Sequence, residues 1–337
     1  MNGLLEYSGL STKLKAMKAK LLTEEDFLFL EEQKDISGIA VYLSKKENYR
    51  DIFAGENEEA IRRHRFEELV RTTLYTDYKK VYRFSHMEQK QFLKAYFMKY
   101  EIALIKRTLR KCFGTKGEIT DRGYVYSQSF EDKCSFDVKS MMAATTVDEV
   151  VGLLYGTVYY DLLNILNKKD DTGLFDYESV LDIFYFKALW KAGHKSLSKK
   201  DLLLIERSFG EEIDLINLEW IYRAKKYYTI SPAQIYSLVI PIFYKLRKQD
   251  IIYLIKTDTE EEFLNTINRL PYIKKSGNVL NRGIEAIYEE RMEKIHKSDI
   301  KKNPNSIACV VSYFYQKEKE IERLVRTIEN VRYSVKV

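Results

Sequence analysis

The segment FGTKGEIT, residues 113–120, is the part of the chain closest to a nucleotide-binding loop. A phosphate-binding loop follows the pattern GxxxxGK[ST], in which glycine backbone N–H groups surround the phosphates and the lysine reaches the terminal ones. Here Lys116 precedes the second glycine, and Glu118 follows it. We therefore interpret the segment as a solvated turn, and we expect no nucleotide site.

Histidine and cysteine do not form a metal-binding pattern. There is no HxxxH pair and no nearby cysteine pair, which structural and catalytic zinc sites usually need. The cysteines are odd in number and widely spaced, which indicates a reducing cytoplasm rather than a disulfide framework. Acidic residues are common, but no pair is confined to one recognisable cleft. We expect no catalytic, cofactor-binding or metal-binding residues, and no cofactor. The residues considered are His64, His86, His194, His296, Cys112, Cys134 and Cys309.

Tyrosine is unusually frequent, with 26 residues against 2 tryptophans. Such rings could stack on bases or line a ligand pocket, but they also suit helix surfaces that are packed without being sealed from water. The net charge is +6, from 56 basic and 50 acidic residues that alternate along the chain. A nucleic-acid-binding protein would cluster its basic residues. We expect packing tyrosines, no nucleic-acid partner and no small-molecule substrate.

The elements that would position any site are helices. Only 14 glycines and 4 prolines interrupt 337 residues, and nearly every segment has a helical period. Thr23 is a candidate N-cap; TVDE at 146–149 and TEEE at 259–262 resemble capping boxes, and SPAQ at 231–234 adds proline at the first helical position. The longest apolar run, 236–244, is too short to span a bilayer, and the N-terminus lacks a signal-peptide core.

An acid followed by an apolar helical stripe occurs three times. In DLINLEWIYRAKKYY, residues 214–228, Asp214 precedes its stripe, and Glu101 and Glu320 precede two more. Steps of three and four place each stripe on one face of a helix. Glu219 and Arg223 stand at i and i+4, as do Glu322 and Arg326, which favours surface ion pairs. The stripes are Leu215, Leu218 and Tyr222; Ile102, Ile105 and Leu109; and Ile321, Leu324 and Ile328.

Shorter blocks upstream of each stripe recur in the same order. RFEELV, DYESVL and GIEAIY place Glu67, Glu178 and Glu285 at 34, 36 and 35 residues before the three stripe acids. Further upstream, three short predicted helices end at Tyr49, Tyr159 and Tyr272. We therefore expect three copies of one three-helix unit, in which the tyrosines superpose and the glutamates superpose. The copies correspond to residues 1–123, 124–230 and 231–337, the first with an extra N-terminal helix and the last with a connecting helix.

These stretches resemble the C subunit of the bacterial and archaeal V-type (A/V-type) ATPases, a relative of the d subunit of the eukaryotic vacuolar ATPase. The resemblance lies in KLKAMKAKLLT, LLYGTVYYDLL, VLDIFYFKALW, DLINLEWIYRAK and the tail NPNSIACVVSYFYQKEKEIERLVRTIENVRY, and it covers almost the whole chain. Asn305 departs from the family pattern, where a larger apolar residue is expected. The first unit also lacks the capping box of the other two.

The resemblance implies an all-α fold in which three similar units close around a pseudo-threefold axis into a funnel. It implies a non-catalytic rotor protein that receives the central axle, made of the D and F subunits, and rests on the membrane ring of proteolipid subunits. Such a chain would lie on the cytoplasmic face of the membrane without spanning it, and we expect a monomer in isolation. Two other classes stay open: a helical-repeat scaffold for another complex, and a helical enzyme with an unrecognised site.

Basic residues of the third helices are the candidates for contact with axle or ring. A ring of many identical subunits cannot match three units equally, so weak, adaptable polar contacts suit that surface. The alternative interpretation is ordinary solvated helix charge. The candidates are Lys106, Arg110, Arg223, Lys226 and Arg326.

Overall fold

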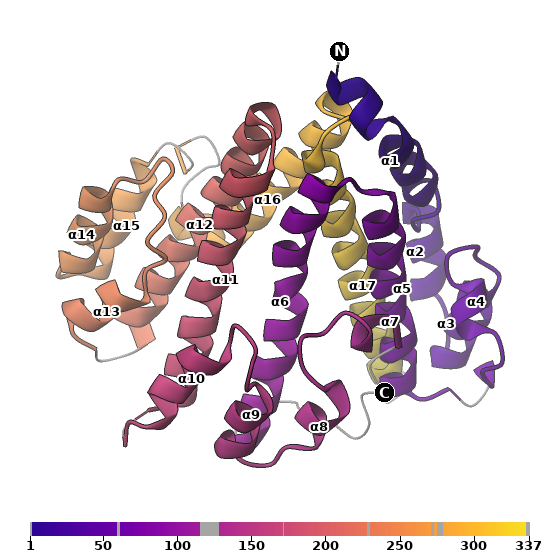
Figure 1. Cartoon of the computed structure of the whole chain (residues 1–337), viewed down its shortest axis with the longest axis horizontal. Coiled ribbons are helices and arrows are strands. Elements are labelled where there is room, and N and C mark those ends of the chain that lie inside the picture. The colour runs from indigo at the N-terminus through magenta and orange to yellow at the C-terminus, as the bar shows by residue number, and fades with distance from the viewer. Residues whose placement is uncertain are drawn as a thin grey trace. The chain divides into compact units, whose positions relative to one another are not determined.

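The computed structural model describes residues 2–58, 61–114, 128–170, 172–227, 230–270, 273–274 and 279–334. Within these residues the chain is built of α-helices and contains no β-strand (Figure 1). The expected all-α class is therefore confirmed. The chain divides into two compact units, each assembled from stretches that are distant in sequence. The three sequence segments 1–123, 124–230 and 231–337 stay a prediction.

Unit 1 comprises Met1–His86, Gly114–Ala143 and Pro304–Val337. The long C-terminal helix α17 packs against α5 and against the N-terminal helices α1, α2 and α3. Thus the two ends of the chain share one core. The helices of this unit are α1 (Asn2–Lys18), α2 (Glu24–Glu31), α3 (Ile36–Ser44), α4 (Arg50–Phe53), α5 (Arg63–Phe84), α7 (Gln128–Glu131), α8 (Val138–Ala143) and α17 (Ile307–Ser334).

Unit 2 comprises Met87–Phe113 and Ala144–Asn303. Its most extensive helix contact joins α6 to α11, and α12 packs against α16, α14, α13 and α11. The helix α16 is interrupted at Gly283, where a φ of 76° leaves the helical region. The helices of this unit are α6 (Met87–Cys112), α9 (Val147–Leu153), α10 (Tyr160–Asn167), α11 (Leu174–Ser196), α12 (Lys199–Tyr227), α13 (Pro232–Leu238), α14 (Lys248–Lys256), α15 (Glu260–Asn268) and α16 (Val279–Lys302).

The three apolar stripes lie on the three longest helices, α6, α12 and α17, and face packed interiors. All three stripe residues of α6 are buried, as are all three of α17. On α12, Leu215 and Leu218 are fully buried, whereas Tyr222 is half-buried and stacks on Phe263 at a ring separation of 5.8 Å. The prediction of buried stripes is confirmed for every residue except Tyr222, whose hydroxyl reaches Glu260 at the surface.

Helix starts follow the predicted caps. Thr23, Thr146 and Ser231 each accept a hydrogen bond from the third helical N–H, and each box is closed by the return bond. Thr259 accepts from the Glu262 N–H at 3.1 Å, but the Glu262 carboxylate accepts from the Asp258 N–H instead. Local sequence therefore determines these helix starts.

The short helices before Tyr49 and Tyr159 end earlier than expected. The helix α3 ends at Ser44 and α9 ends at Leu153; each is followed by a turn, and each tyrosine is then the N-cap of the next helix, α4 or α10. Both tyrosines are fully buried, so the turn serves to direct the ring inward. Tyr272 lies outside the described residues.

Candidate functional site

The acid before each stripe is buried and binds a segment that is distant in the sequence. On α6, Glu101 accepts a hydrogen bond of 2.5 Å from the Tyr159 hydroxyl. Both side chains are buried, and a hydroxyl–carboxylate bond in such a place is short because the acceptor is charged. The contact ties the turn between α9 and α10 to the long helix.

The corresponding acid of α17 is Glu320. It accepts the Tyr49 hydroxyl at 2.6 Å, the Leu22 N–H at 2.6 Å and the Lys317 ammonium at 2.5 Å. Lys317 is fully buried and lies 4.6 Å from the Tyr49 ring centroid. Burial, and then the neighbouring Glu320, raise the pKa of Tyr49 well above its ordinary value, so the phenol stays a donor.

On α12 the acid is Asp214, and its partners are backbone groups. It accepts the N–H groups of Tyr244, Lys245 and Leu246 at 3.2, 2.7 and 3.0 Å. One turn further, Asn217 accepts the Ile240 N–H at 2.8 Å and donates to the Ile240 carbonyl at 3.1 Å. The non-helical strap 239–247, between α13 and α14, is thus fixed along α12 without a regular ladder of its own.

A second polar contact recurs nine residues after each stripe acid. Arg110 on α6 contacts Glu178 on α11 at 2.6 Å, and Arg223 on α12 pairs with Glu285 on α16. On α17 the position is occupied by Glu329, which pairs with Arg63 of α5, and Arg63 also contacts Glu67 at 2.9 Å. The same long-helix to middle-helix contact is therefore made three times, once with the charges exchanged. Glu178 and Glu285 are therefore the middle-helix partners in two of these contacts, whereas Glu67 is linked to the third through Arg63.

The five interface candidates occupy the long helices, and four of them pair with acids of their own unit. Lys106 contacts Asp182 at 2.8 Å, and Lys226 contacts Glu260 at 2.9 Å; Arg110 and Arg223 make the pairs just described. Arg223 also contacts Glu219 at 3.0 Å, which confirms that i, i+4 pair. Arg326 is exposed, and none of the ion pairs found in the described chain includes it, while Glu322 contacts Lys319 instead.

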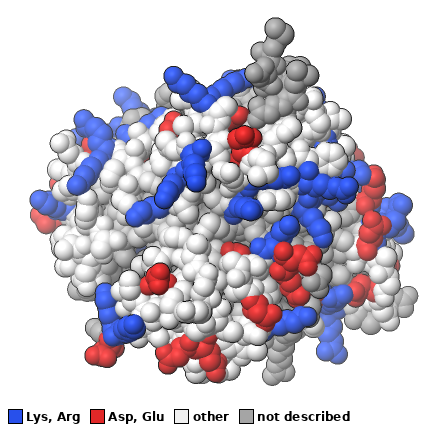
Figure 2. Space-filling model, viewed as in Figure 1, with Lys and Arg blue, Asp and Glu red and all other residues white. Residues whose placement is uncertain are grey.

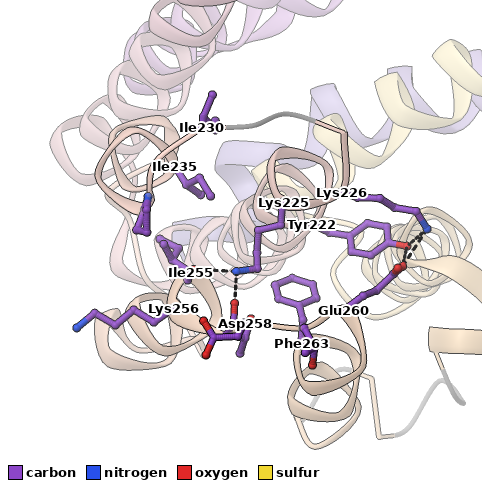
Figure 3. A pocket seen from close by; sticks show the side chains of 13 residues that line it. Tyr222, Lys225, Lys226, Ile230, Ile235, Ile255, Lys256, Asp258, Glu260 and Phe263 are labelled. Carbon is purple, nitrogen blue, oxygen red and sulfur yellow. Dashed lines mark hydrogen bonds and ion pairs between the residues drawn. The ribbon is translucent and has the colours of Figure 1, made fainter.

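Unit 2 has a pocket of about 600 Å³ at the C-terminal end of α12, shown in Figure 3. Lys225 extends across it and donates to the carbonyls of Ile255 and Thr257 at 2.9 and 2.5 Å. Burial lowers the pKa of this lysine. On the other side the Tyr222 hydroxyl and Lys226 both contact Glu260 (Figure 3). Lys225, Lys226 and Glu260 are thus engaged in contacts within the protein.

The histidines lie apart, and the described residues hold no group of three or more His, Cys, Asp or Glu spaced for a metal ion. His194 contacts Glu206 at 3.1 Å, and His296 is buried. Burial, with Lys99 and Arg207 nearby, lowers the pKa of His296 to about 3. In the glycine-containing segment 113–120, residues 115–120 lie outside the described residues.

The surface carries both signs of charge. Figure 2 shows Lys and Arg side chains beside Asp and Glu on the face drawn, as the alternating charges of the sequence predicted. Across the described stretches, no helix has the length and apolar character that crossing a bilayer requires.

Two buried polar side chains of the long helices escaped prediction from the sequence. Lys317 stands three residues before Glu320, and Asn217 stands three residues after Asp214. Each therefore shares a helix face with its acid, next to an apolar stripe. A lysine or asparagine beside an apolar stripe could have indicated a buried polar contact, because burying such a group without a partner costs free energy.

The sequence matches known proteins along nearly the whole chain. The family model described as ATP synthase (C/AC39) subunit matches residues 10–337. The C subunit of the A-type ATP synthase of Methanosarcina barkeri is 26% identical over 333 residues, covering 96% of this chain and 88% of the relative. That of Methanosarcina mazei is 27% identical over 346 residues with the same coverage, and that of Pyrococcus furiosus is 23% identical over 329 residues, covering 94% and 84%. The chain therefore belongs to the C/AC39 family of A-type and V-type ATP synthase subunits.

Proposed function

We propose that this chain is a non-catalytic part of the central-stalk rotor that couples the axle, formed by the D and F subunits, to the membrane proteolipid ring. The observation that carries the proposal is the family match over residues 10–337. In this role the chain takes no part in nucleotide chemistry. It transmits torque for ATP-driven ion transport or for ATP synthesis.

The proposal includes three similar units around a pseudo-threefold axis, forming a funnel. It is supported by contacts that recur on the three long helices: a buried acid, Glu101, Asp214 or Glu320, followed nine residues later by an ion pair with the middle helix. Two of these acids accept a tyrosine hydroxyl, from Tyr159 and from Tyr49. The buried acid and the ion pair thus follow each other at the same spacing on all three long helices, as expected of a repeated unit.

A torque adaptor must resist bending and slipping. The helices α6, α12 and α17 contain 26, 29 and 28 residues, and every stripe residue except the half-buried Tyr222 is buried. Close packing gives such an interior low compressibility. The polar anchors add directional contacts that fix the turn or strap against the helix. These features suit a stiff mechanical part.

The expected partners are the D and F subunits at one end and the proteolipid ring at the other, with the chain peripheral on the cytoplasmic face of the membrane. No nucleic acid, cofactor or small-molecule substrate is part of the proposal, and the isolated chain would be a monomer. Lys106, Arg110, Arg223, Lys226 and Arg326 remain the interface candidates. Arg326 is the clearest candidate for contact with a partner, because the other four form ion pairs within the chain.

A reconstitution experiment tests this proposal. The purified full chain is mixed with the D–F axle, with detergent-solubilised proteolipid ring, and with both, and each mixture is separated by size. We expect a stable complex with each partner and a ternary complex with both, together with no ATP hydrolysis by the chain alone. Failure to bind either partner would overturn the rotor assignment.

A further inference from the structure

The hairpin formed by α11 and α12 carries the densest group of unpaired cations among the described residues of unit 2. Five lysines lie within fourteen positions, all of them exposed. Among the described residues none of the five has an ion-pair partner. The two acids that follow the turn of the hairpin are engaged elsewhere: Asp201 accepts the Ser198 hydroxyl at 2.8 Å, and Glu206 contacts His194. The five are Lys187, Lys191, Lys195, Lys199 and Lys200.

Several basic residues toward the C-terminal ends of α5 and α16 are paired within the chain, whereas Arg83, Lys301 and Lys302 in the last turns have no ion-pair partner among the described residues. Lys80 contacts Asp77 at 3.2 Å, Lys297 contacts Glu293 at 2.5 Å, and Lys294 pairs with Glu290. Unpaired basic residues therefore occur at other helix ends as well, but the α11–α12 hairpin gathers five of them within fourteen positions, three at four-residue spacing along α11.

The fold gains little from these five charges. Lys187, Lys191 and Lys195 stand at i, i+4 and i+8, and like charges at that spacing destabilise a helix by about 0.2–0.5 kcal/mol per pair. The helix dipole favours a cation only in the last turn of α11, which includes Lys195 and not Lys187. Lys199 and Lys200 lie in the first turn of α12, where the dipole disfavours positive charge. The arrangement thus needs an explanation outside the chain.

The spacing of the lysines indicates what kind of partner surface would fit them. At 1.5 Å per residue, Lys187 to Lys195 form a ridge about 12 Å long on one face of α11. A straight ridge of this kind matches carboxylates at i, i+4 and i+8 on another helix. A bilayer would instead meet a plane with apolar side chains inserted. Of the large exposed apolar residues described in the hairpin, Phe175 and Tyr227 lie at the far ends of α11 and α12, and Leu203 lies near the lysines.

We propose that this lysine ridge, Lys187, Lys191 and Lys195 with Lys199 and Lys200 at its end, docks the acidic face of a helix on a partner protein. The inference rests on the proposed function, in which the chain joins other rotor subunits. Exposed charges at the rim of an interface mainly raise the association rate and set its salt dependence, and this ridge would act in that way.

The test compares two triple variants of the full chain. The ridge variant is Lys187→Gln, Lys191→Gln and Lys195→Gln; the control is Lys294→Gln, Lys297→Gln and Lys301→Gln, the same charge change at the end of α16. Each is titrated with the D–F axle and with a helical peptide that has glutamate on one face at every fourth position. We expect about tenfold weaker binding and a shallower salt dependence for the ridge variant, and less than twofold change for the control.

Folding is monitored in the same samples. The ridge variant should keep or slightly raise its Tm, since like-charge repulsion is removed. Three outcomes would overturn the inference: equal weakening by both triple variants, equally tight binding of a scrambled peptide of the same composition, or ridge-dependent binding that is tighter to anionic vesicles or duplex DNA. If the parent chain and the ridge variant bind the axle equally, the ridge inference fails while the proposed function stands. If the parent chain binds neither axle nor ring, the proposed function fails, and the peptide titration still decides the ridge.

Discussion

At the scale of single residues, a few buried polar side chains lie on the faces of the long helices that are otherwise apolar. Lys317 is fully buried and held between Glu320 and the Tyr49 hydroxyl. A buried ion pair seldom adds net stability, because desolvation offsets most of the attraction. Its effect is directional: Glu320 is satisfied only when α3, α4 and the segment at Leu22 are correctly placed. We infer that these groups select one packing among three similar helices.

Removing one hydroxyl from this cluster should destabilise the protein measurably. Tyr49→Phe keeps the ring but deletes the donor to Glu320 and the acceptor for Lys317. Because the remaining groups stay buried, we expect a loss of about 1–3 kcal/mol in the free energy of unfolding. Urea denaturation followed by circular dichroism measures it. Tyr155→Phe serves as control, since Tyr155 is 78% exposed and should change stability by less than about 0.5 kcal/mol. Equal stability of both variants would mean that the cluster has no energetic role.

Asp26 gives a pH-dependent prediction. Burial would raise its pKa, but hydrogen bonds from Lys46, from the Thr23 backbone and side chain and from Tyr42 outweigh burial and lower it from 3.8 to about 2. A depressed carboxyl pKa contributes stability that is present above pH 4 and is lost as pH falls toward 2. The contribution is about 2 kcal/mol. In urea titrations, the wild-type advantage over Asp26→Asn should be constant at pH 5–7 and shrink below pH 4. A constant difference down to pH 2 would refute the assignment.

The residue scale was only partly predictable from the sequence. Glu101, Asp214 and Glu320 stood out because each precedes a stripe, yet nothing local identifies their partners. Tyr49 and Glu320 are 271 residues apart, so their contact depends on the tertiary fold. Asp214 shows the limit clearly: it has the same spacing as the other two acids but binds three backbone N–H groups.

At the scale of elements, the strap 239–247 shows how a non-helical segment is held in a helical protein. Its backbone lacks helix partners, and Asp214 and Asn217 supply them from α12. Tyr244 packs over Gly210, where an added Cβ would approach its ring atoms to 2.5 Å. A glycine is thus required at 210 for close approach of the strap, and α12 acts as its template.

Removing the two hydrogen bonds between the Asn217 side chain and the Ile240 backbone should loosen the strap 239–247 before the whole protein unfolds. Asn217→Leu is similar in size but leaves the Ile240 N–H buried without a partner, while the Ile240 carbonyl keeps only the Ile242 N–H at 2.8 Å; we expect a cost of about 1–3 kcal/mol. Hydrogen exchange should show lost protection at Ile240 and Leu246, with α6 and α11 unchanged. Asn164→Leu, on the half-buried face of α10, provides the matched control. Uniform loss of protection across unit 2 would instead indicate global destabilisation.

The stripe of α12 gives the prediction for packing. Leu218 is fully buried in a cluster with residues of α13, α14, α15 and α16, so Leu218→Ala should cost about 2–5 kcal/mol through lost contacts and an unfilled cavity. Thermal and urea unfolding measure this loss. Leu28→Ala on α2 is the comparison, because Leu28 is 60% exposed. A loss below about 1 kcal/mol at Leu218 would show that the surrounding helices collapse into the space.

Elements were easier to predict than contacts because their signals are local. Caps at Thr23, Thr146 and Ser231 depend on residues three positions apart, and the stripes depend on a period within a single helix. The end of α3 and α9 was misplaced because the turns before Tyr49 and Tyr159 look helical by composition, while the buried ring sets where the chain must bend. Tertiary burial overrode local preference there.

At the scale of the whole molecule, the chain combines stiff interiors with a surface of mixed charge. Of its 56 basic and 50 acidic residues, Lys106, Arg110 and Arg223 are among those that pair between neighbouring helices, whereas the five lysines of the α11–α12 hairpin form no such pair within the described part of the chain. The chain belongs to the C/AC39 family, and in the proposed adaptor role it would have to bind two partners while keeping its own shape.

The last prediction separates ATP hydrolysis from ion transport in the assembled enzyme. Membranes that lack this chain should retain hydrolysis by the soluble head, while ATP-driven ion transport stops, since the proposed adaptor joins the parts that perform these two steps. Adding back the purified chain should restore transport in proportion to its binding, and Leu218→Ala protein should restore less at temperatures near its lowered Tm. Hydrolysis is measured as phosphate release and transport with an ion-sensitive dye in the same vesicles. Transport that persists after complete removal of the chain would falsify the adaptor role, and hydrolysis by the purified chain in proportion to its concentration would indicate an enzyme instead.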